Sequence, residues 1–95
     1  MTSKNDELLD LINLGAASVN ILRAIGVNTY QELAEVGPVE AYCRMKLRGI
    51  HVSKVMLYAL QGALLNIHWN DLEPDLKVKL VADADNLLAE AVEAG

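Results

Sequence analysis

The sequence predicts an all-α protein, a compact bundle of five to six short helices with a helix-hairpin-helix-like unit around a buried central helix. Three observations support this fold class. Hydrophobic residues make up 53% of the 95 residues, which excludes a disordered chain. Aromatic residues make up only 4%, so leucine, valine, isoleucine and alanine must fill the core, and this aliphatic and alanine-rich mix favours helix over strand. Apolar residues also recur at helical spacing along most of the chain.

Two helices joined by a tight hairpin are predicted at the N-terminus. The first begins near Asn5 or Asp6, either of which is a good N-cap, and ends at Ile12. The tripeptide Asn13-Leu14-Gly15 follows directly. Because asparagine tolerates the left-handed backbone conformation and glycine adopts it freely, we expect a sharp reversal here. Together with the next helix, this reversal would form the helix-hairpin-helix-like unit.

The second predicted helix covers about residues 16–25, and Gly26 stands where a left-handed residue commonly ends a helix. Thr29 and Glu32 have the spacing of a capping box, in which each side chain accepts a hydrogen bond from the other residue's backbone N–H. This box predicts a third helix over about 30–36. So short a helix is stable only when it packs against the rest of the protein.

Pro38 predicts the start of a fourth helix, since proline is tolerated in the first turn. Residues 48–52 are expected to form a loop, with Ser53 as the N-cap of a fifth helix over about 54–66. That fifth helix is apolar on nearly all sides, which predicts that it lies at the centre of the domain. Gly62 in its middle costs about 1 kcal/mol relative to alanine, so we expect another helix to cross closely there.

A break near Asn70 and the helix-opening Pro74 predict a last helix of about 74–92. Its apolar stripe follows steps of three and four residues: Leu76, Leu80, Ala84, Leu87, Leu88 and Ala91. The first half of the stripe is expected to cover the central helix. The second half extends past so small a domain, which predicts a dimer surface formed by Leu80, Ala84, Leu87, Leu88 and Ala91. Residues 1–95 are thus expected to form one domain with a core of about 8–80.

The charge and cysteine content narrow the classes of function. Thirteen acidic and eight basic residues give a net charge of −5, which handicaps binding to nucleic-acid phosphates. The single cysteine, Cys43, rules out a disulfide within the chain and fits a reducing compartment. The first ten residues are polar and acidic, unlike a signal peptide, and no apolar run approaches the roughly 20 residues that cross a bilayer. We therefore expect a cytoplasmic protein without membrane association.

Two groups of residues together resemble a known family. The first group comprises Leu11, Asn13, Leu14, Gly15, Ser18, Leu22, Gly26, Val27, Thr29 and Leu33. The second, more specific group comprises Gly37, Ala41, Tyr42, the run Leu-Tyr-Ala-Leu-Gln-Gly-Ala at 57–63, and His68 with Trp69. Over about 8–80 the chain resembles the C-terminal domain of the TfoX (Sxy) family. Long members of that family carry a separate N-terminal domain before it.

The resemblance implies a role in gene regulation. TfoX proteins regulate natural competence, so a chain similar to them is expected to act at competence-like promoters together with the CRP activator or RNA polymerase. The domain itself would then be a module that binds other macromolecules, without catalytic activity.

The hairpin is a first candidate site, formed by Asn13, Leu14, Gly15, Ala16, Ala17 and Ser18. Free backbone N–H groups at the start of a helix can bind a phosphate, helped by the helix dipole. Hairpins that hold DNA usually add a second glycine and a nearby basic residue, whereas here Glu7 and Asp10 flank the motif. The alternative interpretation is a packing corner that orients two helices.

A second candidate site is a basic surface, formed by Arg44, Lys46, Arg48, His51 and Lys54. It holds half of all lysine and arginine residues within eleven positions that contain no acidic residue. On a chain of net charge −5, this asymmetry indicates a contact for phosphate or for an acidic protein. The alternative is that basic residues in the last turn of a helix only offset its dipole.

The remaining chemically capable residues do not predict an enzyme. Cys43, His51 and His68 match no metal-binding spacing, and nothing positions a third group beside a Cys–His pair. We therefore expect no metal, no cofactor and no catalysis. His68 is expected to cap the end of the fifth helix. Trp69 either fills space beneath the last helix or anchors a partner, and the resemblance favours the first role.

The favoured hypothesis is thus a non-enzymatic interaction module that assists transcriptional regulation through protein contacts. The first alternative is weak DNA binding without sequence specificity through the hairpin. The second alternative is a structural homodimerisation domain built on the last helix.

Overall fold

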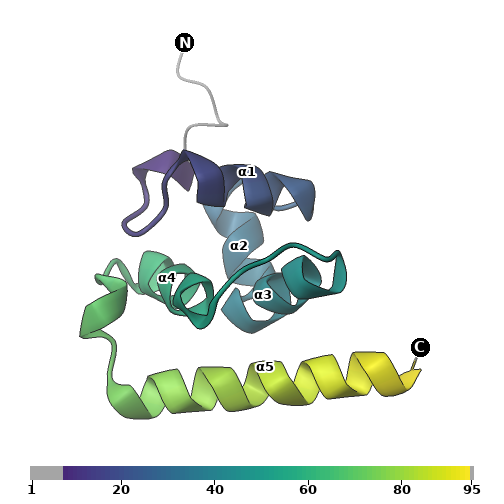
Figure 1. The fold of residues 1–95 in the computed structure, drawn as a ribbon. Coiled ribbons are helices and arrows are strands. Elements are labelled where there is room, and N and C mark those ends of the chain that lie inside the picture. The colour runs from purple at the N-terminus through teal and green to yellow at the C-terminus, as the bar shows by residue number, and fades with distance from the viewer. Residues whose placement is uncertain (1–7, 95) are drawn as a thin grey trace.

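The computed structural model describes residues 8–94, and this part of the chain is all-helical, which confirms the predicted fold class (Figure 1). Five α-helices and two short 3-10 helices follow one another over these residues, with no strand between them. Their bounds are η2 Leu8–Asp10, α1 Ala16–Ala24, α2 Tyr30–Val36, α3 Pro38–Leu47, α4 Lys54–Leu65, η3 Trp69–Asp71 and α5 Pro74–Ala94. None of the helices in the described range has the length and hydrophobicity that a bilayer crossing requires.

The helices form layers, with α5 as a long rod beneath α3 and α4, and with η2 and α1 above them (Figure 1). Helix α3 contacts α1, α2, α4 and α5, while α4 contacts α2, α3, α5 and η3. Helix α4 is therefore central, as its apolar pattern predicts, and α3 shares that position. This middle layer carries both ends of the loop that connects α3 to α4.

The middle of α4 is buried and its two ends are not. Leu57 and Leu60 are completely buried, and Ala63 is 2% exposed. Val55 near the start is 42% exposed, and Leu65 at the end is 48% exposed. The all-round apolar pattern of this helix therefore places hydrophobic side chains on the surface as well as in the core.

The core draws apolar side chains from almost every element. The largest fully buried ones are Leu8, Leu22, Leu33, Met45, Leu57, Leu60, Val19, Val27 and Cys43. Each large aliphatic side chain contributes roughly 1.5–3 kcal/mol when it leaves water, and together these residues hold the short helices in place. No charged or polar side chain is buried among the described residues.

Local signals set most helix ends. The Thr29 hydroxyl accepts a hydrogen bond from the Glu32 N–H at 3.1 Å, and the Glu32 carboxylate accepts one from the Thr29 N–H at 3.1 Å, which confirms the capping box. The Ser53 hydroxyl accepts from the Val55 N–H at 3.3 Å and caps α4 as predicted. Helix α4 ends at Leu65, one residue earlier than predicted, because its C-cap Asn66 has a left-handed backbone with φ 59°.

The first predicted helix is partly wrong. Its predicted start at Asn5 or Asp6 lies outside the described residues. The described part is a 3-10 helix, Leu8–Asp10, and does not continue as an α-helix to Ile12. Backbone hydrogen bonds here join residues three apart, and Asn13 then turns the chain with φ 75°. A helix-hairpin-helix is therefore not confirmed over the described residues.

Gly62 is required by a close contact, although not with a crossing helix as predicted. A Cβ atom at this position would lie 2.5 Å from Asn13 Nδ2 and 2.5 Å from the Ile67 carbonyl oxygen. The Ile67 N–H also donates to the Gly62 carbonyl oxygen at 2.9 Å. The space above Gly62 is thus filled by an asparagine side chain and by the turn that follows α4.

Candidate functional site

All five residues of the predicted basic surface are exposed, and they lie around one connection in the fold. Arg44 and Lys46 are in the last turn of α3, Arg48 is its C-cap, His51 is in the loop, and Lys54 begins α4. Gly49, with φ 82°, allows the chain to leave α3. Residues 41–70 contain no acidic residue, and Glu40, just before this interval, is the acidic residue that pairs with Arg44.

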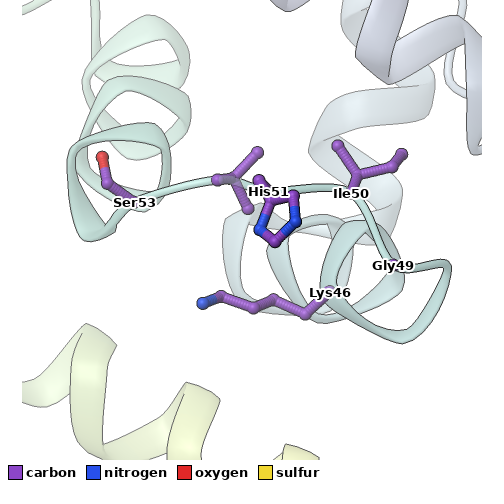
Figure 2. Close-up of a pocket in the computed structure, with 6 residues that line it drawn as sticks. Lys46, Gly49, Ile50, His51 and Ser53 are labelled. Atoms are coloured by element: carbon purple, nitrogen blue, oxygen red, sulfur yellow. The ribbon is translucent and has the colours of Figure 1, made fainter.

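A cavity of about 390 Å³ lies beside the loop. Its walls are Lys46, Gly49, Ile50, His51, Val52 and Ser53. Figure 2 shows the Lys46 side chain extending along one side of the loop, with the His51 ring directed towards it. Of the five predicted residues, the cavity therefore brings together Lys46 and His51, while the other three lie outside its wall.

The electrostatics of this cavity favour an anion. The N-terminus of α4 carries a partial positive charge from the helix dipole, and Ser53 in the cavity wall is its N-cap. Lys46, Arg48 and Lys54 take part in none of the ion pairs among the described residues. Arg44 is different, because its Nε lies 3.0 Å from a Glu40 carboxylate oxygen. The lysine charges near the loop are thus available to a partner.

A second cavity, of about 300 Å³, lies on the other side of the same loop, between α1 and α4. We call it the α1–α4 groove; it is lined by Asn13, Ser18, Ile21, His51, Val52, Ser53, Val55, Met56, Ala59 and Trp69. No pattern in the sequence predicted this groove. The fifth predicted helix could have indicated it. Because this helix is apolar on nearly all sides, some of its apolar residues, such as Val55 and Met56, had to lie outside the core.

The predicted hairpin is an internal packing corner at Asn13. The Asn13 Nδ2 donates to the Ile67 carbonyl oxygen at 2.9 Å and to the Ala59 carbonyl oxygen at 3.4 Å. Its Oδ1 accepts from the Trp69 N–H at 3.1 Å. The Asn13 amide therefore joins the start of the described chain to the turn after α4.

The rest of the predicted hairpin is spread over different environments. Leu14 is buried and Ser18 lines the α1–α4 groove, whereas Gly15, Ala16 and Ala17 are exposed. Gly15 is extended, with φ −112°, and does not take the left-handed conformation that the sequence analysis expected. Asn13 alone makes the reversal.

Trp69 is half-buried in an aromatic cluster at the end of the groove. Its ring stacks on Tyr58 with centroids 6.4 Å apart and on His68 with centroids 5.9 Å apart. The Lys77 Nζ from α5 lies 5.5 Å from the centroids of both Trp69 and Tyr58. The His68 Nδ1 accepts from the Asn70 N–H at 3.1 Å, so His68 caps η3 and not the end of α4 as predicted.

Cys43 behaves as a buried hydrophobic residue. Its Sγ donates to the Ala84 carbonyl oxygen at 3.5 Å, and burial, followed by the charges of Glu40 and Asp85, raises the pKa of the thiol above its ordinary value. The thiol therefore stays protonated and is a poor nucleophile. In the part of the chain that the structure describes, no three histidine, cysteine, aspartate or glutamate side chains are grouped so that they could hold a metal ion.

Only part of the predicted dimer surface is on the outside of the protein. Leu80 is 5% exposed and Ala84 is 1% exposed, so both belong to the core of the chain. Leu87, Leu88 and Ala91 are half-buried. Leu87 and Ala91 line a cleft of about 200 Å³ with the α3 residues Glu40, Cys43, Arg44 and Leu47. Packing of α5 on α3 explains why the first two positions are not available.

The chain is similar to known proteins both in sequence family and in fold. A family model described as the TfoX C-terminal domain matches residues 4–84. Two solved structures from Listeria monocytogenes are similar to this chain: an uncharacterized protein in a triclinic form and a protein of unknown function in a tetragonal form. Both are 34% identical to it with a TM-score of 0.77; each match covers 84% of this chain, and 91% and 99% of the respective structures. No curated protein matches the chain.

Proposed function

Because this chain belongs to the TfoX C-terminal domain family, we propose that it is a non-enzymatic interaction module that assists transcriptional regulation of competence-like genes. It does so through protein contacts with the transcription machinery, with the CRP activator or RNA polymerase as the partner. The resemblance to competence regulators supports a role in transcriptional regulation. The chemistry of the protein surface supports contact with another protein.

The observation that carries the proposal is the exposed basic surface on an acidic chain. Lys46, Arg48 and Lys54 are solvent-exposed and take part in no ion pair of the described residues, although the protein has a net charge of −5. Exposed cations without an ion-pair partner can attract and orient a negatively charged partner. An acidic protein surface fits this chemistry.

The size of the basic surface argues for protein over DNA. Affinity for duplex DNA rises with the number of phosphates that basic side chains contact, and it falls as salt is added. Each contact contributes about −0.9 to the slope of the logarithm of affinity against the logarithm of salt concentration. With four basic residues near the loop, affinity for duplex DNA at physiological salt is expected to be weak. A protein partner adds apolar contacts that do not weaken with salt.

The direct test is binding of the chain to purified CRP and to purified RNA polymerase. A double variant, Lys46→Glu with Arg48→Glu, is expected to weaken binding by about tenfold or more, because attraction becomes repulsion at two positions. Lys79→Glu is the control, since the Lys79 side chain is 71% exposed on α5, where it pairs with Asp83 of the same helix. Equal binding by all three proteins, or none by the unmodified chain, would count against the proposal.

Direct DNA binding by the hairpin is the alternative. Gly15, Ala16 and Ala17 at the start of α1 are exposed, and no side chain caps this helix end. A titration with short duplex DNA at low salt separates the two ideas. Saturable binding that is unaffected by Lys46→Glu and Arg48→Glu would favour the hairpin.

Self-association through the C-terminal half of α5 is a second candidate function. Leu47 is 56% exposed beside Leu87 and Ala91, so the cleft between α3 and α5 presents an apolar edge to solvent. Leu47→Lys should then convert a dimer to a monomer in sedimentation equilibrium. Val78→Lys is the matched control, because Val78 is 70% exposed at the other end of α5.

A further inference from the structure

Two cavities adjoin the loop between α3 and α4, and only one of them contains a lysine. His51, Val52 and Ser53 line both of them. The cavity on the α3 side includes Lys46 and lies at the N-terminus of α4, so it is cationic. The α1–α4 groove lies on the other side and has a mixed lining, in which apolar side chains stand beside Asn13, Ser18 and Ser53. A ligand that crosses the loop would meet both.

The apolar wall of the groove comes from three elements. Ile21 belongs to α1, Val55 and Met56 belong to α4, and Trp69 belongs to η3. Val55 is 42% exposed, and the other three are half-buried, so none of these side chains is fully used by the core. Methionine and tryptophan are also residue types that adapt to, or anchor, a bound side chain.

The dimensions of the groove limit what can occupy it. A volume of about 300 Å³ is at the low end of the range of roughly 300–1,000 Å³ for small-molecule sites. One or two apolar side chains of a partner would fill this space, and a large cofactor would not. The groove is also open at His51, where the cationic cavity begins.

We propose that this loop binds an acidic–apolar protein segment, with carboxylates on the Lys46 and His51 side and an adjacent apolar side chain in the α1–α4 groove. Charge complementarity selects the occupant, because residues 41–70 contain no acidic residue and Lys46 and Lys54 take part in no ion pair of the described residues. The inference rests on the proposed function, of which it specifies the chemistry of the partner.

A nucleic acid fits this arrangement less well. Phosphates would use the cationic cavity but would leave Ile21, Val55 and Met56 without a counterpart. Nonspecific recognition of single strands relies on several aromatic platforms in a positively charged groove, whereas the α1–α4 groove contains one indole and no lysine or arginine. The apolar wall therefore favours a protein segment.

The test uses short synthetic peptides and the single tryptophan of the chain. Trp69 lines the groove, so its fluorescence reports occupancy. The first probe alternates glutamate with leucine and phenylalanine, and the second has the same charge with serine in place of the apolar residues. The acidic–apolar peptide is expected to bind about tenfold or more tightly than the acidic one, because an apolar side chain leaves water.

Two variants separate the two halves of the site. Val55→Ser makes the groove polar without altering charge, and Lys46→Glu reverses the cationic half. Val78→Ser and Lys79→Glu are the matched controls, both at exposed positions of α5. Each site variant should weaken the acidic–apolar peptide by several-fold or more, and each control should leave it unchanged.

The outcomes are distinct for this inference and for the proposed function. Equal affinity for both peptides, with no effect of Val55→Ser, would mean that the groove is unused, while binding through the basic surface would stand. No binding of either peptide would overturn the inference, and the experiment with CRP and RNA polymerase would still decide the proposed function. A Trp69 response to duplex DNA alone would assign the surface to nucleic acid. A dimer that Val55→Ser dissociates without any peptide would identify a second copy as the occupant.

Discussion

The corner at residues 13–18 and the loop at 48–53 both lead into an α-helix, and both carry polar residues. In the corner, the Asn13 amide makes two hydrogen bonds to the turn at Ile67 and Trp69 and a third to the Ala59 carbonyl oxygen in α4. At the loop, Lys46 at the end of α3 and His51 line an open cavity. The difference shows that a polar turn is free to bind a partner only where folding does not use its polar groups.

The two regions are also expected to differ in how much a substitution lowers the stability of the fold. A group that satisfies a backbone N–H far away in the sequence cannot be lost cheaply, because its partner is then left unsatisfied. An exposed charge without a partner can be replaced with little effect on folding. Substitutions at four positions, from the largest expected effect to the smallest, test whether this contrast is real.

Asn13→Ala should have the largest effect. It removes all three side-chain hydrogen bonds and places alanine at φ 75°, a conformation that costs roughly 1–2 kcal/mol outside glycine, asparagine and aspartate. We expect the free energy of unfolding to fall by about 3 kcal/mol, measured by urea denaturation. Asn20→Ala, at an exposed position in α1, is the control and should change it by about 0.5 kcal/mol or less.

Asn13→Gly separates the two contributions to that loss. Glycine adopts a positive φ without strain, so this variant loses only the hydrogen bonds. A stability close to that of the unmodified protein would show that the amide bridge contributes little and that the corner is held by its backbone. The amide would then be available for other contacts, and the contrast with the loop would disappear.

Gly62→Ala should have the next largest effect, about 2 kcal/mol of destabilisation. Alanine is the better helix former by about 1 kcal/mol, but its Cβ would lie 2.5 Å from Asn13 Nδ2 and from the Ile67 carbonyl oxygen. Gly15→Ala is the control, since no atom lies within 4 Å of a Cβ there. In an Asn13→Gly background one of the two clashes is removed, so Gly62→Ala should cost less than in the unmodified protein.

These two positions also mark the limit of prediction from sequence. The capping box at Thr29, the start of α3 at Pro38 and the Ser53 cap were all predicted, because each depends on residues within a few positions. The partners of Asn13 are 46 to 56 residues away, and no local pattern indicates them. The sequence therefore identified Gly62 as costly but assigned the wrong neighbour.

The candidate site also combines features set by neighbouring residues with features set by the tertiary fold. The basic surface was predicted because its residues are adjacent in sequence, and the loop keeps them together. The α1–α4 groove was missed, since Ile21, Met56 and Trp69 meet only through the tertiary fold. Apolar periodicity also could not distinguish Leu80, which packs in the core, from Leu87, which lies half-exposed.

Ser53→Ala should have a smaller effect, about 1 kcal/mol, because it removes a single N-cap hydrogen bond to Val55. Thr29→Ala is the comparison, since it disrupts a capping box with two reciprocal hydrogen bonds and should cost at least as much. Urea denaturation measures both. If Ser53→Ala proved the more damaging, the loop would have a structural role as large as that of the corner.

Lys46→Glu should have the smallest effect on stability, within about 0.5 kcal/mol, because Lys46 is exposed and forms no ion pair. Its ammonium group lies 5.5 Å from the centroid of the Tyr42 ring, a contact worth roughly 0.5–1 kcal/mol at an exposed site. Reversal of this charge places a carboxylate in the last turn of α3, where the helix dipole disfavours it, and beside the N-terminus of α4, where the dipole favours it. These two effects oppose each other, so the contact with Tyr42, at the lower end of that range, sets the size of the expected loss. Unchanged urea denaturation together with loss of the acidic–apolar peptide would locate the role of Lys46 in binding. A loss of stability comparable to that of Asn13→Ala would instead make the loop a second structural corner, and the basic surface would no longer support a partner.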